Sequence, residues 1–133
     1  MTETEVNHRN QPKKIRLLLV DDEEAYVDVL ANRLSRRGFD VTKTYSGTQA
    51  LQAMRGREFD VTVLDLKMED MDGIEVLKVL KRMDPNMQVI MLTGHGSETA
   101  ARQGTEFGAF DYLMKPCEFE ALVDKIREAA STP

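Results

Sequence analysis

Short apolar runs alternate along the chain with stretches in which apolar residues recur at helical spacing. Each run is brief and is bounded by polar or turn-forming residues, which is typical of a buried strand. On this pattern the sequence predicts strands at residues 15–20, 39–45, 59–64, 87–92 and 109–114.

The stretches between these runs predict helices. Val27, Leu30, Ala31 and Leu34 stand at positions i, i+3, i+4 and i+7, which marks a helix with one buried face. Gly38 follows where a C-cap glycine is expected. The other apolar faces are Ala50, Leu51 and Met54; Val76, Val79, Leu80 and Met83; and Phe119, Leu122, Val123 and Ile126. Strands that alternate with helices indicate βα units and a parallel sheet. We therefore expect five βα units in one α/β domain with three layers.

The helix expected between Gly94 and Gly108 has the weakest pattern. Its segment is rich in glycine, serine and threonine, which are poorer helix formers than alanine or leucine. Its apolar face contains only Ala100, Ala101 and Phe107. One interpretation is a marginal surface helix. The other is an element of low stability that changes position during a switch, because moving elements come from the weakly stabilised parts of a fold.

Composition narrows the class of protein. A chain of 133 residues has room for one domain with a hydrophobic core. A net charge of −5 argues against a nucleic-acid surface, and no apolar stretch is long enough for a membrane span. Cys117 is the single cysteine, so an internal disulfide is excluded. We expect a cytoplasmic protein with a flexible tail at 1–13, a domain at 14–130 and a short tail at 131–133.

Polar side chains follow the predicted strands at one end. Asp21 and Asp22 follow the first strand, and Asp65 follows the third. Because parallel strands end at the same edge of a sheet, we expect these carboxylates to meet there, where α/β sheets bind ligands. Mg²⁺ prefers oxygen ligands. We expect Asp22 and Asp65 to bind it directly, Asp21 to act through water, and the backbone carbonyl of Lys67 to add an oxygen.

The same edge has the groups for phosphoryl transfer. An ionised Asp65 is a nucleophile able to form an aspartyl phosphate, and as a carboxylate it needs no general base. Catalysis of this transfer is mostly positioning and charge neutralisation. Lys115, after the fifth strand, and Thr93, after the fourth, are placed to bind the phosphoryl oxygens.

Each residue taken alone also has an ordinary structural explanation. Asp65 fits a helix cap or a turn, and Asp22 fits the N-cap of the first helix. Thr93 with Gly94 fits a turn, and Lys115 before Pro116 carries little information by itself. Their occurrence at the same end of successive strands favours a shared site.

Over residues 14–130 the chain resembles the receiver domains of two-component response regulators. The resemblance rests on Asp21-Asp22, on Asp65 within Leu-Asp-Leu-Lys-Met followed by Met-Asp-Gly, on Leu92-Thr93-Gly94, and on residues 111–116, Asp-Tyr-Leu-Met-Lys-Pro. It implies a doubly wound, flavodoxin-like sheet in the order 2-1-3-4-5. It also implies that Asp65 accepts a phosphoryl group from a sensor histidine kinase or a histidine phosphotransfer protein, with Mg²⁺ as the cofactor and Mn²⁺ as an alternative ion.

The resemblance further implies a switch. Phosphate draws in Thr93 beside Gly94, Tyr112 rotates inward, and Pro116 is a candidate for a cis peptide bond. The partner surface would comprise the helix between Gly94 and Gly108, the fifth strand and the last helix, including Arg102, Glu106, Tyr112, Lys125 and Glu128. The alternative for Tyr112 is a half-buried aromatic that packs on the neighbouring helix. The protein would be a monomer or a weak dimer that forms on phosphorylation.

The chain departs from the family at Glu69, where a proline is frequent. A loop without that proline is less rigid, and Glu69 adds negative charge near an acidic site. Lys67 and His95 stand at rim positions that affect access of the hydrolytic water, although a solvent-exposed loop is the simpler explanation for His95.

Other classes fit less well. No output domain follows the last helix, so we expect a stand-alone regulator that catalyses only its own phosphorylation and dephosphorylation. A haloacid-dehalogenase-like phosphatase would need an Asp-x-Asp pattern, but Lys67 stands two residues after Asp65. A nucleotide-binding module would need a glycine-rich loop where the acidic residues 21–24 stand. A receiver-like interaction module that works without phosphorylation is the remaining alternative.

Overall fold

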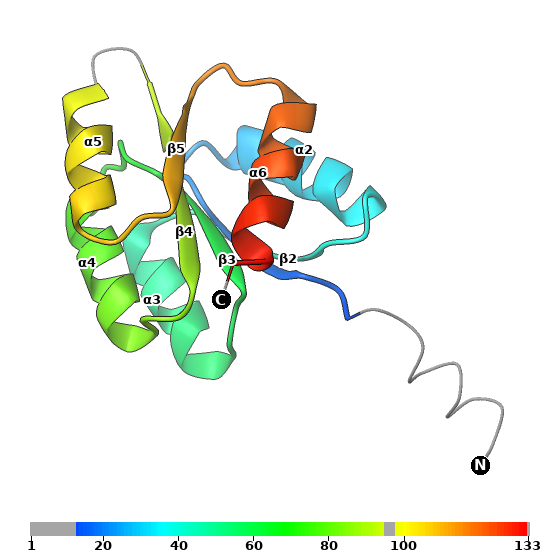
Figure 1. Ribbon diagram of the computed structural model, residues 1–133, viewed down its shortest axis with the longest axis horizontal. Coiled ribbons are helices and arrows are strands. Elements are labelled where there is room, and N and C mark those ends of the chain that lie inside the picture. Colours follow the sequence, from blue (N-terminus) through cyan, green and yellow to red (C-terminus); the bar gives the residue numbers. More distant parts are fainter. Residues whose placement is uncertain (1–12, 95–97, 133) are drawn as a thin grey trace, which may run out of the picture.

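A parallel sheet with helices on both faces forms the fold (Figure 1). The computed structural model describes residues 13–94 and 98–132. Within these ranges five strands lie in the order β2-β1-β3-β4-β5, and every neighbouring pair is parallel. The strands are β1 (Arg16–Val20), β2 (Asp40–Thr44), β3 (Val61–Asp65), β4 (Gln88–Thr93) and β5 (Asp111–Met114). The expected doubly wound order 2-1-3-4-5 is confirmed.

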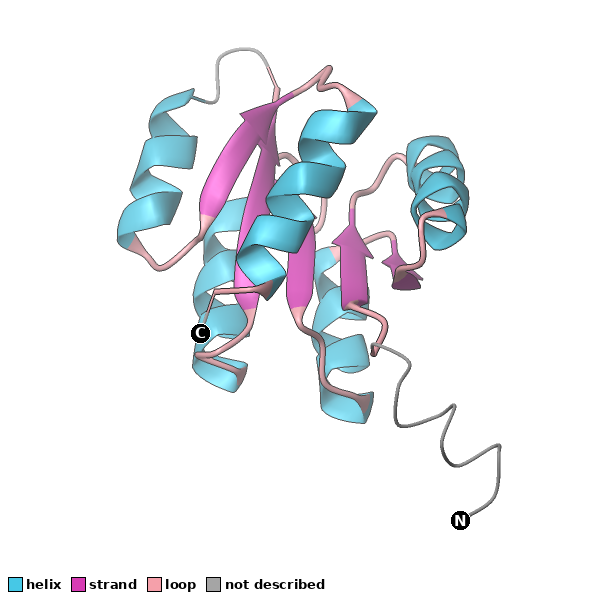
Figure 2. Ribbon diagram, turned by 45° about the vertical axis from the view of Figure 1, so that its right-hand side comes forward, coloured by secondary structure: helices cyan, strands magenta, loops and turns pink. Residues whose placement is uncertain are grey.

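The helices cover the two faces of the sheet unequally (Figures 1 and 2). They are α2 (Glu24–Arg36), α3 (Gly47–Gly56), α4 (Gly73–Met83), α5 (Glu98–Glu106) and α6 (Phe119–Ala130). Side chains of β1 alternate between the faces: Leu17 and Leu19 pack with α2 and α6, whereas Leu18 and Val20 pack with the side of α3, α4 and α5. Because both faces of the sheet are covered, its central strands β1, β3 and β4 are mostly apolar and buried, whereas the edge strands β2 and β5 are less buried.

All five strands begin one or two residues later than the apolar pattern predicted. For β2 and β5 the reason is that the residues before them close helices instead. Gly38 has a φ of +93°, and the N–H of Phe39 donates to the Leu34 carbonyl at 3.3 Å, so Phe39 completes the end of α2. The same arrangement ends α5, where the N–H of Ala109 donates to the Gly104 carbonyl at 3.0 Å. Strand β5 therefore begins at Asp111 rather than at residue 109.

Strands β3 and β4 each extend one residue further than predicted at their carboxyl ends. Asp65 is the last residue of β3 and Thr93 the last of β4. Helix α4 also differs in one detail. Leu77 is buried in it, whereas Met83, predicted on the buried face, is 40% exposed.

Helix α5 has the thin apolar face that the sequence predicted. Its buried residues are Ala101 and Gly104, whereas α4 buries Val76, Leu77 and Leu80. Phe107 was expected to belong to this face, but it follows the helix and is 44% exposed, with the Lys78 ammonium 4.3 Å from its ring centroid. Whether α5 moves stays a hypothesis.

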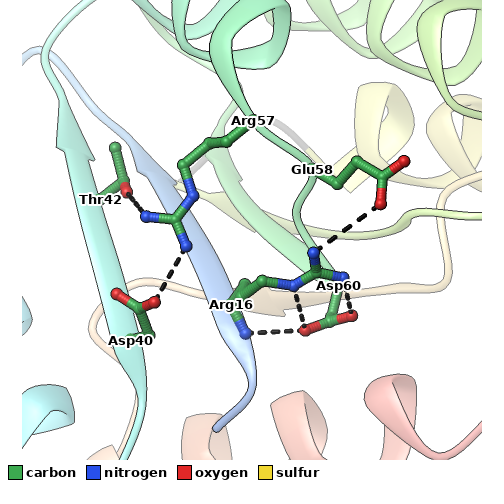
Figure 3. Close-up of polar contacts among 6 residues, drawn as sticks. All are labelled: Arg16, Asp40, Thr42, Arg57, Glu58 and Asp60. Carbon is green, nitrogen blue, oxygen red and sulfur yellow. Dashed lines mark hydrogen bonds and ion pairs between the residues drawn. The ribbon is translucent and has the colours of Figure 1, made fainter. Parts of the chain in front are cut away.

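The amino ends of β1, β2 and β3 are joined by ion pairs (Figure 3). Asp60 accepts hydrogen bonds from Arg16 three times: from the backbone N–H at 2.8 Å, from Nε at 3.2 Å and from Nη2 at 2.9 Å. Arg57 donates to Asp40 on β2 at 2.9 Å. Among the helices of the described ranges, none combines the length and apolar content needed to cross a membrane.

Candidate functional site

Asp21, Asp22 and Asp65, here called the acidic cluster, meet at the carboxyl edge of the sheet. Strands β1 and β3 are parallel neighbours in which Val20 lies opposite Leu64, so the residues that follow them also lie side by side. One carboxylate oxygen from each member lies within 4.8 Å of the others. Asp21 and Asp65 are buried, at 4% and 5% exposure. The predicted meeting of these carboxylates is therefore observed.

Lys115 brings a positive charge to the acidic cluster from the end of β5. Its Nζ lies 2.6 Å from Asp21 Oδ2, 3.7 Å from Asp65 Oδ1 and 3.8 Å from Glu23 Oε1. Burial lowers the pKa of this ammonium, but the hydrogen bond with Asp21 and the charge of Asp65 outweigh burial, and the net pKa is raised. The peptide bond between Lys115 and Pro116 is cis. Lys115 thus remains a cation that contacts both buried carboxylates.

The charge balance of the acidic cluster suits a cation. Burial, together with the neighbouring charge of Asp21, raises the pKa of Asp65 to about 6, and the ammonium of Lys115 offsets only part of this effect. Closely spaced carboxylate oxygens are the ligand set that Mg²⁺ takes in proteins, usually with waters in the remaining positions. The residues present therefore fit a hard divalent ion. The predicted role of the Lys67 carbonyl stays a prediction, and Lys67 itself pairs with Asp72 in an isolated antiparallel bridge.

Thr93 reaches the same edge from β4. It is fully buried, and its hydroxyl donates to the Gly94 carbonyl at 3.1 Å. Asp65 lies opposite Leu92 in the register of β3 with β4, which places Thr93 one residue beyond that pair. Because this acceptor is the carbonyl of the next residue, rotation about one side-chain bond would let the Thr93 hydroxyl donate to an acceptor in the site instead.

Tyr112 lies on β5, opposite Met91 of β4. Its side chain is half-buried and packs against the core on the side of α3, α4 and α5. This placement agrees with the packing alternative and is also where the predicted rotation would start, so the switch role of Tyr112 stays a prediction.

The loop of residues 66–72, here the 66–72 loop, forms the open side of the site. Together with Asp22, one member of the acidic cluster, it lines a surface depression. Asp22 is not the N-cap of the first helix, because α2 begins after Glu23. Its Oδ2 instead accepts the backbone N–H of Glu69 at 3.1 Å. The loop that we expected to be less rigid without a proline is thus tied to the acidic cluster.

Two contacts at the site were not predicted. The ring of Tyr26, on the first turn of α2, lies with its centroid 4.5 Å from the Lys115 ammonium. Asp70 in the 66–72 loop binds the amino end of α3. The position of Tyr26 just after the acidic pair was the one available signal in the sequence, whereas nothing in the sequence pointed to Asp70. His95 lies outside the described residues.

Comparisons with known proteins agree with this geometry. A family model described as "Response regulator receiver domain" matches residues 17–127. Over 117 residues the chain is 36% identical to the transcriptional regulatory protein GlrR of Escherichia coli K12, covering 88% of this chain and 26% of that relative. It is also 36% identical over 117 residues to the transcriptional regulatory protein YkoG of Bacillus subtilis, covering 88% and 51%. The chain therefore spans about a quarter to a half of the length of these relatives.

Solved structures show the same likeness. The CheY-like receiver domain protein of Methanospirillum hungatei JF-1 superposes with a TM-score of 0.84 at 30% identity, covering 89% of this chain and 94% of that one. The receiver domain protein of Clostridium thermocellum gives a TM-score of 0.84 at 32% identity, covering 87% and 94%.

Proposed function

The chain belongs to the response regulator receiver family, and from that premise we propose that it is a signalling switch whose phosphoacceptor is Asp65. The observation that carries this proposal is the position of Asp65: a buried carboxylate at the end of β3, within the acidic cluster and 3.7 Å from Lys115. A carboxylate in this setting is available as a nucleophile, and its surroundings can neutralise the charge of an incoming phosphoryl group.

In the proposed reaction a carboxylate oxygen of Asp65 forms a bond to phosphorus while the phosphorus–nitrogen bond of a donor phosphohistidine breaks. The electron pair of that bond stays on the imidazole, which takes up a proton from solvent. Lys115 moves from Asp21 toward a phosphoryl oxygen, and the hydroxyl of Thr93 turns from Gly94 to donate to another. Mg²⁺, held by Asp21, Asp22, Asp65 and the Lys67 carbonyl, would neutralise negative charge on the phosphoryl group.

The donor in this proposal is a sensor histidine kinase or a histidine phosphotransfer protein. Receiver domains are signalling switches rather than conventional enzymes, so the only catalysis we propose is phosphorylation and dephosphorylation of the chain itself. A surface depression lined by Asp22 and residues 66–72 lies beside the acidic cluster, and we propose that the donor approaches from this side. A cytoplasmic location and a single-domain regulator stay predictions.

The output surface in this proposal consists of α5, β5 and α6. Arg102, Glu106 and Glu128 are exposed on it. Lys125 of α6 is paired with Asp111 of β5 at 2.8 Å, and the other oxygen of Asp111 accepts the Tyr112 N–H at 2.7 Å. We propose that a rotation of the Tyr112 side chain shifts β5 and, through the pair of Asp111 and Lys125, also α6. The surface of α5, β5 and α6 would then bind a partner protein or a second copy of the chain.

The proposal is tested by the intact mass of the protein after incubation with acetyl phosphate, with and without Mg²⁺. We expect a gain of one phosphoryl group that requires Mg²⁺ and is lost in Asp65→Asn. If the wild type gains no phosphoryl group and forms no beryllofluoride adduct, an interaction module that works without phosphorylation is favoured. A gain that persists in Asp65→Asn would move the phosphoacceptor elsewhere.

A further inference from the structure

Two consecutive residues of the 66–72 loop are hydrogen-bonded to different parts of the fold. The backbone N–H of Glu69 donates to Asp22 Oδ2 at 3.1 Å, on the side of the acidic cluster. The side chain of Asp70 instead contacts the amino end of α3. Its Oδ1 accepts the N–H of Gly47 at 3.1 Å, and its Oδ2 accepts the N–H and the hydroxyl of Thr48, each at 3.0 Å.

The contact of Asp70 with α3 uses the strongest donors that a helix offers to a carboxylate. The first N–H groups of a helix have no partner within it and carry the positive end of its dipole. Asp70 accepts two of them from outside the helix, while Ser46, the N-cap, accepts the N–H of Gln49. The loop is thereby attached to a regular element instead of resting on side-chain packing alone.

Packing restricts the loop at the same place. A Cβ added at Gly47 would lie 2.9 Å from Met71 Sδ and 2.8 Å from Val76 Cγ2, so Met71 of the loop sits directly on the first residue of α3. At its base the loop is closed by the N–H of Gly73, which donates to the Leu66 carbonyl at 3.3 Å. The position of the Glu69 N–H is thus set by contacts on both sides of it.

The N–H of Glu69 is a group that this chain has and a proline would lack. We propose that this N–H orients the Asp22 carboxylate for Mg²⁺, and that Asp70 is a positioning residue that holds the N–H in place through α3. The inference rests on the proposed function, because it takes Asp22 as a metal ligand. Carboxylates that bind metals are themselves held by hydrogen bonds, and loss of such a partner typically weakens metal binding about 10- to 100-fold.

The test compares Glu69→Pro with Glu69→Ala. Both variants lose the side chain and its charge, and only the proline variant also lacks the backbone N–H and has φ fixed at residue 69. The measurement is the dissociation constant for Mg²⁺ alone, by calorimetric titration without any phosphodonor. We expect Glu69→Pro to bind Mg²⁺ about tenfold more weakly than Glu69→Ala. Equal dissociation constants in the two variants would overturn the inference.

Asp70 is tested by a second matched pair, Asp70→Asn and Asp72→Asn. Each removes one negative charge from the 66–72 loop. Asp72 is the N-cap of α4 and accepts the N–H of Ile74, a role that asparagine performs equally well. In Asp70→Asn only one side-chain oxygen is left for three donors. We expect weaker Mg²⁺ binding than in Asp72→Asn, and faster hydrogen exchange at the amides of Glu69 and Thr48.

Failure of the inference and failure of the proposed function have different outcomes. If the wild type binds no Mg²⁺, the metal part of the proposed function is wrong and the inference is overturned with it. If the wild type binds Mg²⁺ and both matched pairs show no difference, only the inference is wrong. If Glu69→Pro does not fold, judged by its circular dichroism spectrum, the Asp70 pair decides.

Discussion

The ammonium of Lys115 lies 2.6 Å from Asp21 Oδ2, closer to that carboxylate than to the proposed phosphoacceptor. Before phosphorylation Lys115 therefore offsets the charge of Asp21 most strongly. Asp65, with its oxygen 3.7 Å from the same ammonium, is left as a buried carboxylate with incomplete compensation. Burial and the neighbouring charge of Asp21 therefore raise the pKa of Asp65 to about 6, because Lys115 offsets only part of their effect.

The raised pKa of Asp65 predicts that Asp65→Asn stabilises the protein when no metal is present. The folded-state pKa of about 6 is above the ordinary value of 3.8, so ionisation of Asp65 at neutral pH opposes folding. We expect the free energy of unfolding in EDTA at pH 7.5 to rise by about 1–3 kcal/mol. The gain should shrink as the pH falls from 6 to 3.8 and vanish below 3.8, where Asp65 is protonated in both the folded and the unfolded state. Urea titrations at several pH values measure it, and a gain that does not depend on pH would contradict this explanation.

Tyr26 is predicted to hold Lys115 in place. The ring centroid is 4.5 Å from the ammonium, within the range in which an aromatic face attracts a cation. Tyr26→Phe keeps the ring, whereas Tyr26→Leu removes it. We expect phosphorylation by acetyl phosphate to be about two- to fivefold slower in Tyr26→Leu than in Tyr26→Phe, which should resemble the wild type. Equal rates in the two variants would show that the ring does not position Lys115.

Close packing between α5 and β4 predicts the effect of a single added methyl group. A Cβ at Gly104 would lie 2.2 Å from the sulfur of Met91, which is fully buried. We expect Gly104→Ala to lower the free energy of unfolding by about 1–3 kcal/mol and to speed hydrogen exchange in α5 more than in β4. Gly56→Ala is the matched control, because nothing lies within 4 Å of its added Cβ. A Gly104→Ala protein as stable as the control would contradict the close fit.

The pair of Arg16 and Asp60 predicts a pH-dependent contribution at the opposite edge of the sheet (Figure 3). Hydrogen bonds from Arg16 lower the pKa of Asp60, so this stabilisation is present above the ordinary pKa of an aspartate and is lost as the pH falls through the lowered value. We expect Asp60→Asn to reduce the free energy of unfolding at pH 7 by about 1 kcal/mol. Asp40→Asn, in the exposed pair with Arg57, should change it less. If Asp60→Asn and Asp40→Asn lower the free energy of unfolding equally at pH 7, the pair of Arg16 and Asp60 stabilises the fold no more than the exposed pair of Arg57 and Asp40.

The sequence allowed prediction of the sheet and of the acidic cluster for one physical reason. Apolar runs that end in aspartates place these residues at the same edge once the strands are parallel neighbours, which needs no knowledge of side-chain contacts. The positions of Phe39 and Ala109 were wrong because an apolar residue that closes a helix has the same pattern as one that begins a strand. The roles of Tyr26 and Asp70 depend on contacts between segments far apart in the chain, for which local patterns carry no signal.

The role of Asp65 as phosphoacceptor is tested by locating the residue that carries the phosphoryl group. The protein is incubated with acetyl phosphate and Mg²⁺, and then treated with borohydride, which reduces an acyl phosphate to an alcohol. Peptide mass mapping then locates the reduced residue. We predict homoserine in place of Asp65, only after incubation with the phosphodonor, and unmodified Asp21 and Asp22. Homoserine at Asp21 or Asp22, or a phosphorylated protein with Asp65 intact, would contradict Asp65 as the phosphoacceptor.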